Sequence, residues 1–343
     1  MADKVVIVGA RRGNTRVEIS ELSQMMGRAG RKHDGNSYPV DIIVEESDAE
    51  HVENGLADDS GMNVNSSLGD IDDLCFHVLG EIASGRIYDE QTAIKWFSRS
   101  LSSLQGGDFN PLDVFDSLDE IECIKKSGGR VMATPLGEIS STYYFHPADV
   151  FTWKSNFDEL FDQGLENDEV APAWALGSIP FGRATGDLDR HRHVVGDCIN
   201  RIPAGLSPMD GSLVNITLWW HCLGGPPVGK MKSVAMDMKK DFGRIRTMLN
   251  ALDYKVAKWE MTDYFDDLEL RVNMAIAPEL LELCKLPGIS KGMASYLYNA
   301  GITGLEELDE SYGNFEGEVS DKFWNTILNA VGRYKLRNRG RWA

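Results

Sequence analysis

Apolar residues recur at the spacing of an α-helix through most of this chain of 343 residues. Three such segments follow one another between residues 71 and 121, and a longer apolar stripe lies between residues 242 and 259. The sequence therefore predicts a mainly α protein. The residues expected to point inward are Ile71, Leu74, Val78, Leu79, Ile82, Ile94, Phe97, Leu101, Leu104, Leu112, Phe115, Leu118, Ile121, Phe242, Ile245, Leu249, Leu252, Val256 and Trp259.

The N-terminal end differs, because it predicts a small α/β part. Residues 4–8 predict a short buried strand, a helix begins around Ser20, and residues 38–44 predict a second strand. Three elements cannot bury both faces of a sheet, so we expect an apolar surface that needs a partner. Its residues are Val5, Val6, Ile7, Ile42 and Ile43.

Composition and periodicity together divide the chain into five parts. We expect an α/β segment at 1–45, an acidic linker without apolar period at 46–69, and three helices with a hairpin at 70–148. A helical bundle is expected at 149–270, and a helical hairpin with a basic tail at 271–343.

The part at 70–148 predicts a winged helix. Three helical segments precede Arg130–Phe145, where strand-like residues flank Thr134–Gly137, which we expect to be the turn of the hairpin. Winged helices bind duplexes in many proteins and are plain scaffold in others, and both interpretations stay open.

Net charge alone does not decide whether the chain binds nucleic acid. The charge is −18, although phosphate binding needs clustered Lys and Arg. The acidic residues concentrate between Asp41 and Glu122, whereas basic residues gather in the first thirty-odd residues, around 230–258 and in the tail 333–341. Because screening confines each patch to about 10 Å, an acidic protein can still present a basic channel.

The octamer QMMGRAGR at residues 24–31 carries the clearest chemistry. A transferring γ-phosphoryl group spreads negative charge over its oxygens, and always-charged guanidinium groups stabilise it. We expect Arg28 and Arg31, three apart on one helix, to reach one phosphate. Gly27 and Gly30 let this helix lie close to an opposing domain.

Two further segments predict contacts with nucleic acid. The helix with the long stripe carries four basic residues on another face, which is either a binding face or a solvated one; they are Lys240, Arg244, Lys255 and Lys258. The turn 287–291 resembles the hairpin of helix-hairpin-helix motifs, in which backbone N–H groups hold a phosphate oxygen. Its predicted contacts are Gly288, Ser290 and Lys291, and an ordinary helix turn is the alternative.

With these motifs in place, the chain resembles the region from the sixth motif to the C-terminus of archaeal fork-remodelling DNA helicases, in the superkiller-like branch of superfamily 2. The octamer matches QxxGRAGR, followed by Asp34-Gly35, an HxLxxIASG-like stretch at 77–85, ATPLG at 133–137, a helical bundle and a helix-hairpin-helix. The resemblance covers nearly all of the chain.

The resemblance implies four modules and their roles. They are the end of the second RecA-like domain, a winged helix, a bundle with a ratchet helix around residues 237–259, and a helix-hairpin-helix. Gln24, Arg28 and Arg31 would be catalytic, Gly27 and Gly30 would lie near the nucleotide, and Arg244 is the best DNA contact of the ratchet helix. Ala251 stands where the family commonly has an aromatic residue.

Other patterns are weaker. GxxxxGK at 224–230 matches a phosphate-binding loop, but Met231 replaces the Ser or Thr that ligates magnesium, so we do not expect nucleotide there. Asp187, Asp189, His191 and His193 are expected to be solvated, and no metal site is predicted. The five cysteines are scattered and predict small core residues in a reducing compartment. We expect a cytoplasmic or nucleoid-associated protein that is not secreted and does not span a membrane.

Two functions follow. In the first, the chain is the DNA-binding and arginine-finger subunit of a split helicase that remodels forked DNA. ATP and magnesium are then bound mainly by a separate polypeptide with the first RecA-like domain and the DExH box. In the second, it is a non-enzymatic DNA-binding accessory protein whose octamer is a relic. The intact octamer favours the first.

Overall fold

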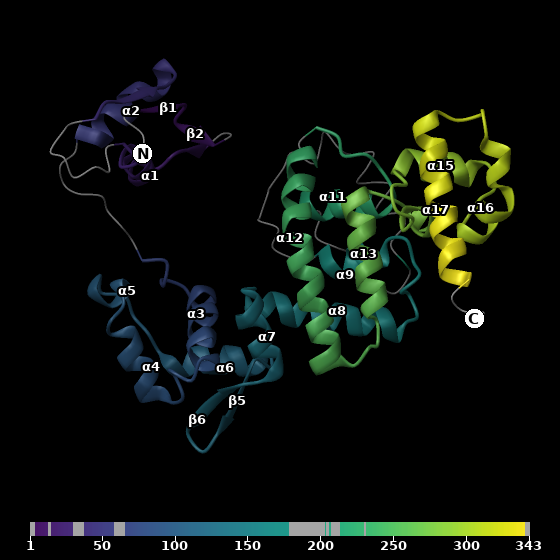
Figure 1. Ribbon diagram of the computed structural model, residues 1–343. Helices are drawn as coiled ribbons and strands as arrows, with labels where there is room; N and C mark the ends of the chain where they lie inside the picture. Colours follow the sequence, from purple (N-terminus) through teal and green to yellow (C-terminus); the bar gives the residue numbers. More distant parts are fainter. Residues whose placement is uncertain are drawn as a thin grey trace. The chain divides into compact units, whose positions relative to one another are not determined.

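The computed structural model describes residues 4–12, 15–29, 38–57, 66–177, 203, 206, 213–229 and 231–339 (Figure 1). The chain divides into two compact units, Met1–Asp70 with Phe97–Asp108, and Ile71–Trp96 with Phe109–Ala343. Helices dominate the described residues, whose three sheets have two strands each. The predicted mainly α fold with a small α/β part is confirmed.

The first unit is built on the predicted strand, helix and strand. Strand β1 (Val5–Val8) pairs in parallel with β4 (Val40–Ile43), and helix α1 (Ile19–Met26) between them packs against β1. A short hairpin of β2 (Arg11–Arg12) and β3 (Thr15–Arg16) follows β1. The core of this unit consists of Ile7, Ala10, Val17, Leu22 and Val52. The single-turn helix α5 (Leu101–Leu104) also belongs to this unit.

The acidic linker expected at 46–69 is wrong in its first half, which forms helix α2 (Glu46–Ala57). This helix packs on α1, and Val52 lies in the core with 4% of its surface exposed. The sequence did not predict this helix because it carries no long apolar stripe. Contacts with residues distant in the sequence stabilise it instead.

One face of the β1–β4 sheet is open, as the strand pattern predicts. Val6, Val8 and Ile43 are 50%, 77% and 57% exposed. Val5, Ile7 and Ile42 were also expected on this surface, but they lie on the other face: Ile7 is buried, and Val5 and Ile42 pack against the same core. The alternation follows from the two-residue period of a strand.

The second unit begins with three helices and a hairpin. The helices are α3 (Ile71–Ala83), α4 (Glu90–Phe97) and α6 (Pro111–Glu120). Strands β5 (Ile124–Ser127) and β6 (Arg130–Ala133) pair in an antiparallel way, and helix α7 (Pro135–Tyr143) follows.

The hairpin lies earlier than the sequence suggests. Its turn is Gly128-Gly129, and both residues have positive φ angles, 57° and 77°, as a two-residue hairpin turn requires. The expected turn at Thr134–Gly137 instead begins α7, where the Thr134 hydroxyl accepts a hydrogen bond from the Gly137 N–H and Pro135 takes the first helical position.

Several residues predicted to point inward are exposed. Ile94, Leu101 and Leu104 are 49%, 42% and 82% exposed, because α4 ends at Phe97 and α5 is a separate turn with its own direction. Ile71 and Leu112 are also exposed, by 42% and 50%, as each lies in the first turn of its helix.

A helical bundle and a C-terminal helical module complete this unit. The bundle packs around large side chains that are fully buried, among them Trp153, Phe157, Phe242 and Phe265. Its helices are α8 (Pro147–Asp162), α9 (Ala171–Gly177), α11 (Leu213–Cys222), α12 (Met231–Leu252), the π-helical turn η2 (Asp253–Ala257) and α13 (Thr262–Met274).

The C-terminal module has a core of its own, with Leu283, Leu297, Leu308 and Ile327 buried at its centre. Its elements are η3 (Pro278–Leu280), α14 (Leu281–Cys284), α15 (Lys291–Asn299), α16 (Leu305–Ser311), η4 (Tyr312–Phe315) and α17 (Asp321–Arg339).

The cysteines of the described residues are core residues, as predicted. Cys75, Cys123, Cys222 and Cys284 are free and buried, and Cys198 lies outside the described residues. Burial raises the pKa of the Cys75 thiol to about 11 and that of Cys123 to about 12, so both stay protonated at neutral pH.

Candidate nucleic-acid interface

The octamer begins on α1 and continues beyond its end. Gln24 lies in the last turn of the helix, Gly27 caps it, and the Arg28 N–H donates to the Met25 carbonyl at 3.1 Å in the turn that follows. The expectation that Arg28 shares a helix with Arg31 is therefore wrong, because α1 stops at Met26. Gly30, Arg31 and the Asp34-Gly35 pair lie outside the described residues.

A groove of about 640 Å³ runs between β1 and α1. Gln24 and Arg28 line it, together with Val5–Gly9. Both side chains are exposed, and Arg28 has no ion-pair partner among the described residues. A guanidinium group with free donors beside a groove is chemically suited to an anionic oxygen.

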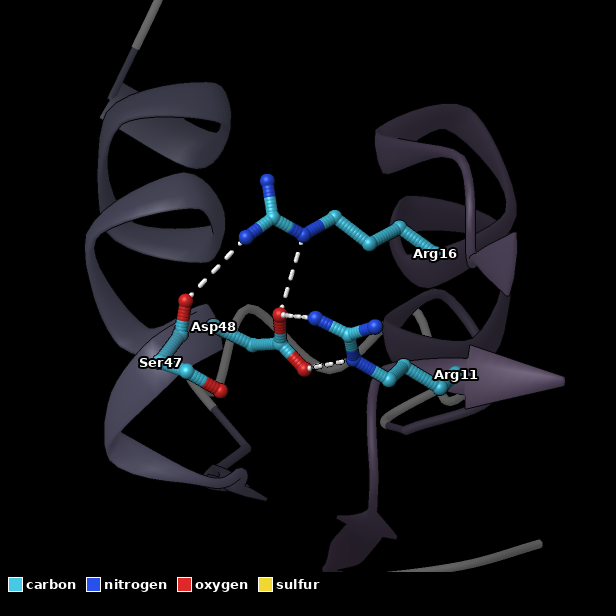
Figure 2. A network of polar contacts seen from close by, with 4 residues as sticks. All are labelled: Arg11, Arg16, Ser47 and Asp48. Atoms are coloured by element: carbon cyan, nitrogen blue, oxygen red, sulfur yellow. Dashed lines mark hydrogen bonds and ion pairs between the residues drawn. The ribbon is translucent and has the colours of Figure 1, made fainter. Parts of the chain in front are cut away.

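Arg11 lines the same groove and belongs to an ion-pair network that sequence analysis missed (Figure 2). The Asp48 carboxylate, 1% exposed, accepts two hydrogen bonds from Arg11, at 2.6 Å from Nε and 2.7 Å from a terminal nitrogen. Arg16 Nε donates to it at 2.9 Å, and another Arg16 nitrogen donates to the Ser47 carbonyl at 3.1 Å. The network ties the β2–β3 hairpin to α2.

The Arg11 hydrogen bonds, aided by those from Arg16, lower the pKa of the Asp48 carboxyl to about 2. The groove also carries an acidic side chain, because Glu21 lines it, and Glu45 interacts electrostatically with Arg11. The basic residues between positions 11 and 16 could have indicated this ion-pair network, but their partner Asp48 lies in the segment that the sequence predicted to be a linker.

The predicted basic face begins on α12. Lys240 and Arg244, one helical turn apart, are both exposed. The Lys240 ammonium pairs with Asp237 at 3.0 Å. The Arg244 guanidinium lies 4.3 Å from the centre of the Phe145 ring and 3.9 Å from an Asp241 oxygen. Arg244 thus links α12 to the segment between α7 and α8 while its donors remain accessible.

Lys255 and Lys258 do not continue this face in a regular way. Steps of three, four and seven residues share a face only in an uninterrupted α-helix, and α12 ends at Leu252 before the π-helical turn. Lys258 has a left-handed backbone (φ 60°), and its ammonium bonds to the Tyr254 carbonyl. Lys255 is exposed, and the structure gives it no ion-pair partner among the described residues.

Trp259 is a packing residue, as expected from its place on the apolar stripe. Its ring contacts Phe157, Phe161 and Phe265, and its N–H donates to Asp158 at 2.7 Å. Ala251, one residue before the end of α12, is half-buried.

The turn before α15 has the predicted form of a tight turn between two helices. Gly288 is exposed with a φ of 88°, and the Ser290 hydroxyl caps α15 by accepting from the Met293 N–H. The Lys291 ammonium, however, turns inward and donates to the carbonyls of Gly224 and Ala275. Burial lowers the pKa of Lys291. Phosphate contact at this turn stays a prediction, carried best by Gly288 and Ser290.

Comparison with known proteins gives the family context of these surfaces. No model of a protein family matches the chain. It is 24% identical over 320 residues to the ATP-dependent DNA helicase Hel308 of Thermococcus kodakarensis. This alignment covers 86% of this chain and 28% of that protein. It is also 25% identical over 340 residues to the Hel308 of Thermoplasma volcanium and 23% identical over 371 residues to that of Methanocella arvoryzae. Those two alignments cover 93% and 94% of this chain and 47% of each relative.

The chain fits the C-terminal half of an archaeal-type helicase. It spans less than half the length of these curated relatives.

The GxxxxGK segment is a turn that packs within the bundle. It follows helix α11, whereas a phosphate-binding loop follows a strand. The Trp220 N–H donates to the Pro226 carbonyl at 2.7 Å, and the Gly225 N–H donates to the Trp220 carbonyl at 2.8 Å. Lys230 lies outside the described residues.

The four metal candidates at 187–193 also lie outside the described residues. Among the residues that the structure does describe, no group of three or more His, Cys, Asp and Glu side chains could hold a metal ion. Within the same part of the chain, no helix has the length and apolar character needed to cross a membrane.

Proposed function

We propose that this chain is the DNA-binding and arginine-finger part of an ATP-dependent DNA helicase that unwinds or remodels forked DNA. The first RecA-like domain, with its DExH box, would belong to a separate polypeptide that binds most of the ATP and magnesium. The observation that carries this proposal is the octamer, whose Gln24 and Arg28 line an open groove.

The described part of the octamer suits a phosphate. Arg11 and Arg16 are both engaged with Asp48, whereas Arg28 is exposed and has no ion-pair partner among the described residues. ATP supplies the γ-phosphoryl group whose developing charge a guanidinium group stabilises. Arg28 would hold an oxygen of this group, and Arg31 would add a second guanidinium.

The open sheet face supports a partner beside this groove. A parallel sheet is stable when both its faces are covered, yet Val6, Val8 and Ile43 are exposed. We propose that the polypeptide with the first RecA-like domain, or a domain joined to it, covers this face. Burial of the three side chains would then contribute to assembly.

For DNA, we propose that α12 is the ratchet helix and contacts the translocating strand. Arg244 and Lys240 offer accessible donors one turn apart, and Lys255 adds an exposed charge beyond the helix end. Gly288 and Ser290 would hold a phosphate of the same strand through backbone N–H groups at the start of α15. The names of the Hel308 relatives agree with this ligand.

The accessory-protein interpretation remains the second candidate, in which the octamer is a relic. The two differ in whether Arg28 and Arg31 act on ATP in the partner. An arginine that stabilises the phosphoryl transition state contributes on the order of 10³-fold in turnover. Lysine keeps the charge but loses the planar fork, so it should not rescue the activity.

The test is the DNA-stimulated ATPase of the reconstituted pair, recovered from the native host with a DExH-box protein. Arg28→Lys and Arg31→Lys are compared with the wild type at equal complex formation. We expect both variants to lose most of the activity. Full activity in both would show that the octamer is a relic and would support the accessory protein.

A further inference from the structure

The β5–β6 hairpin presents a compact basic face. In the strand register, Lys125 lies opposite Met132 and Ser127 lies opposite Arg130. Residues opposite each other in an antiparallel pair point to the same face, so these four side chains share one surface. All four are exposed, Met132 by 57%. We call this surface the outer face of the hairpin.

Tyr88 extends the outer face beyond the two strands. Its carbonyl accepts the Val131 N–H at 2.9 Å, which fixes it beside β6. The Arg130 guanidinium lies 5.9 Å from the centre of the Tyr88 ring, and the ring is 45% exposed. Two cations therefore flank an aromatic ring and a methionine, a combination that suits phosphate oxygens and the apolar edges of sugars.

The Gly128-Gly129 turn lets another backbone approach the hairpin closely. No atom lies within 4 Å of a Cβ built at either position, so there is open space where a side chain would stand. The hairpin projects from the helices around it (Figure 1).

Helix α6 has the opposite character. When three helices precede a hairpin, the helix immediately before the hairpin is the one that would enter a major groove. The exposed positions of α6 include Asp113, Asp116, Asp119 and Glu120. Its four carboxylates would repel the phosphates on both sides of a groove.

Lys126, on the inner face of the hairpin, neutralises part of this acidity. Its ammonium lies 2.6 Å from an Asp116 oxygen and 3.1 Å from an Asp119 oxygen. Lys125 and Arg130 are thus left free of the α6 carboxylates. Asp89 interacts electrostatically with Arg130, while one of its carboxylate oxygens accepts hydrogen bonds from the N–H and the hydroxyl of Thr92.

We propose that the outer face of the β5–β6 hairpin binds the sugar–phosphate backbone of duplex DNA and that α6 stays out of the groove. Lys125 and Arg130 hold phosphates, while Tyr88 and Met132 pack against the sugars between them. This inference rests on the proposed function in that its ligand is DNA. It adds a separate contact for the duplex arm, apart from the single-strand contacts proposed on α12.

The experiment measures binding of the full chain to a blunt duplex and to a single strand of equal length, across a series of salt concentrations. In Lys125→Ala/Arg130→Ala, the salt slope for the duplex should fall by about 1.8, at ~0.9 per phosphate contact. Between about 50 and about 200 mM salt, that difference amounts to a roughly twelve-fold smaller loss of affinity. Binding of the single strand should not change.

Two further variants separate charge from structure. Lys125→Arg/Arg130→Lys keeps both charges and should retain the wild-type slope. Asp113→Asn/Glu120→Gln on α6 should leave the slope unchanged, since these residues make no phosphate contact. All of these positions are exposed, and thermal melting verifies that each variant is folded.

The outcomes distinguish this inference from the proposed function. If the wild type binds the single strand but the alanine variant keeps its duplex slope, only the hairpin contact is refuted. A wild type that binds the single strand and not the duplex also overturns it. If the wild type binds neither, the proposed DNA function fails as well.

Discussion

The ratchet-helix proposal can be tested through the salt dependence of single-strand binding. Of the four basic residues predicted on this face, Arg244 and Lys255 are the least engaged within the described part of the chain, because Lys240 pairs with Asp237 at 3.0 Å and the Lys258 ammonium donates to the Tyr254 carbonyl. Arg244 lies 3.9 Å from its closest acidic oxygen, at Asp241. The perturbation is therefore the double variant Arg244→Ala/Lys255→Ala.

Its magnitude follows from counterion release. Each lost phosphate contact reduces the salt slope for a single strand by ~0.7, so the double variant should lose about 1.4. Between about 50 and about 200 mM salt, the variant's affinity should then fall roughly seven-fold less than that of the wild type. Fluorescence anisotropy with a labelled single strand measures both quantities.

The control must separate a specific contact from general loss of charge. Lys232→Ala/Lys239→Ala removes the same charge from another exposed face of α12 and should barely alter the slope. Arg244 also packs on the Phe145 ring, so Arg244→Lys with Lys255 intact tests whether the charge or the stacking matters. An unchanged slope and affinity in the alanine variant would mean that the face is merely solvated.

Three further outcomes are expected. The purified chain alone should hydrolyse no ATP, and steady-state turnover that Lys230→Ala abolishes would revive the GxxxxGK turn as a nucleotide site. The open sheet face should promote association, so Val8→Lys/Ile43→Lys should reduce both self-association of the isolated chain and capture of the DExH-box partner. A monomeric wild type whose residues 4–12 and 38–45 resist hydrogen exchange would contradict this. The pKa of Asp48 is lowered to about 2, so its contribution to stability is complete above the usual carboxyl pKa and is lost as the pH falls from about 4 towards 2. Hydrogen exchange of the first unit measures its unfolding in acid, and the Asp48→Asn variant should lack this pH dependence.

Local patterns predicted those parts of the fold whose stability depends on a repeated apolar face. The stripe from Phe242 to Leu252 predicted α12 because residues three and four apart meet on one side of a helix, and all its apolar members in the helix are buried. The short apolar runs at residues 4–8 and 38–44 likewise predicted β1 and β4. The octamer could likewise be recognised without a structure, because the phosphate contacts predicted for it depend on the residue types alone.

Boundaries were less predictable, because single residues with special conformations decide them. Thr134 and Pro135 look like a turn in the sequence, yet together they form the cap and first position of α7. The two adjacent glycines before them make the turn instead. Gly27 ends α1 within the octamer, which removes Arg28 from the helix on which it was expected.

What the sequence by itself determined is the mainly α class and the strand–helix–strand at the N-terminus, because both depend on local apolar patterns; the phosphate contacts that it predicts stay predictions. What only the tertiary structure decided is which charges remain free. Asp48 engages Arg11 and Arg16, 37 and 32 residues away, and Lys291 reaches the carbonyl of Gly224, 67 residues away. Ion pairs and inward-turned lysines leave no periodic trace along the chain, because their partners meet only after the elements have packed.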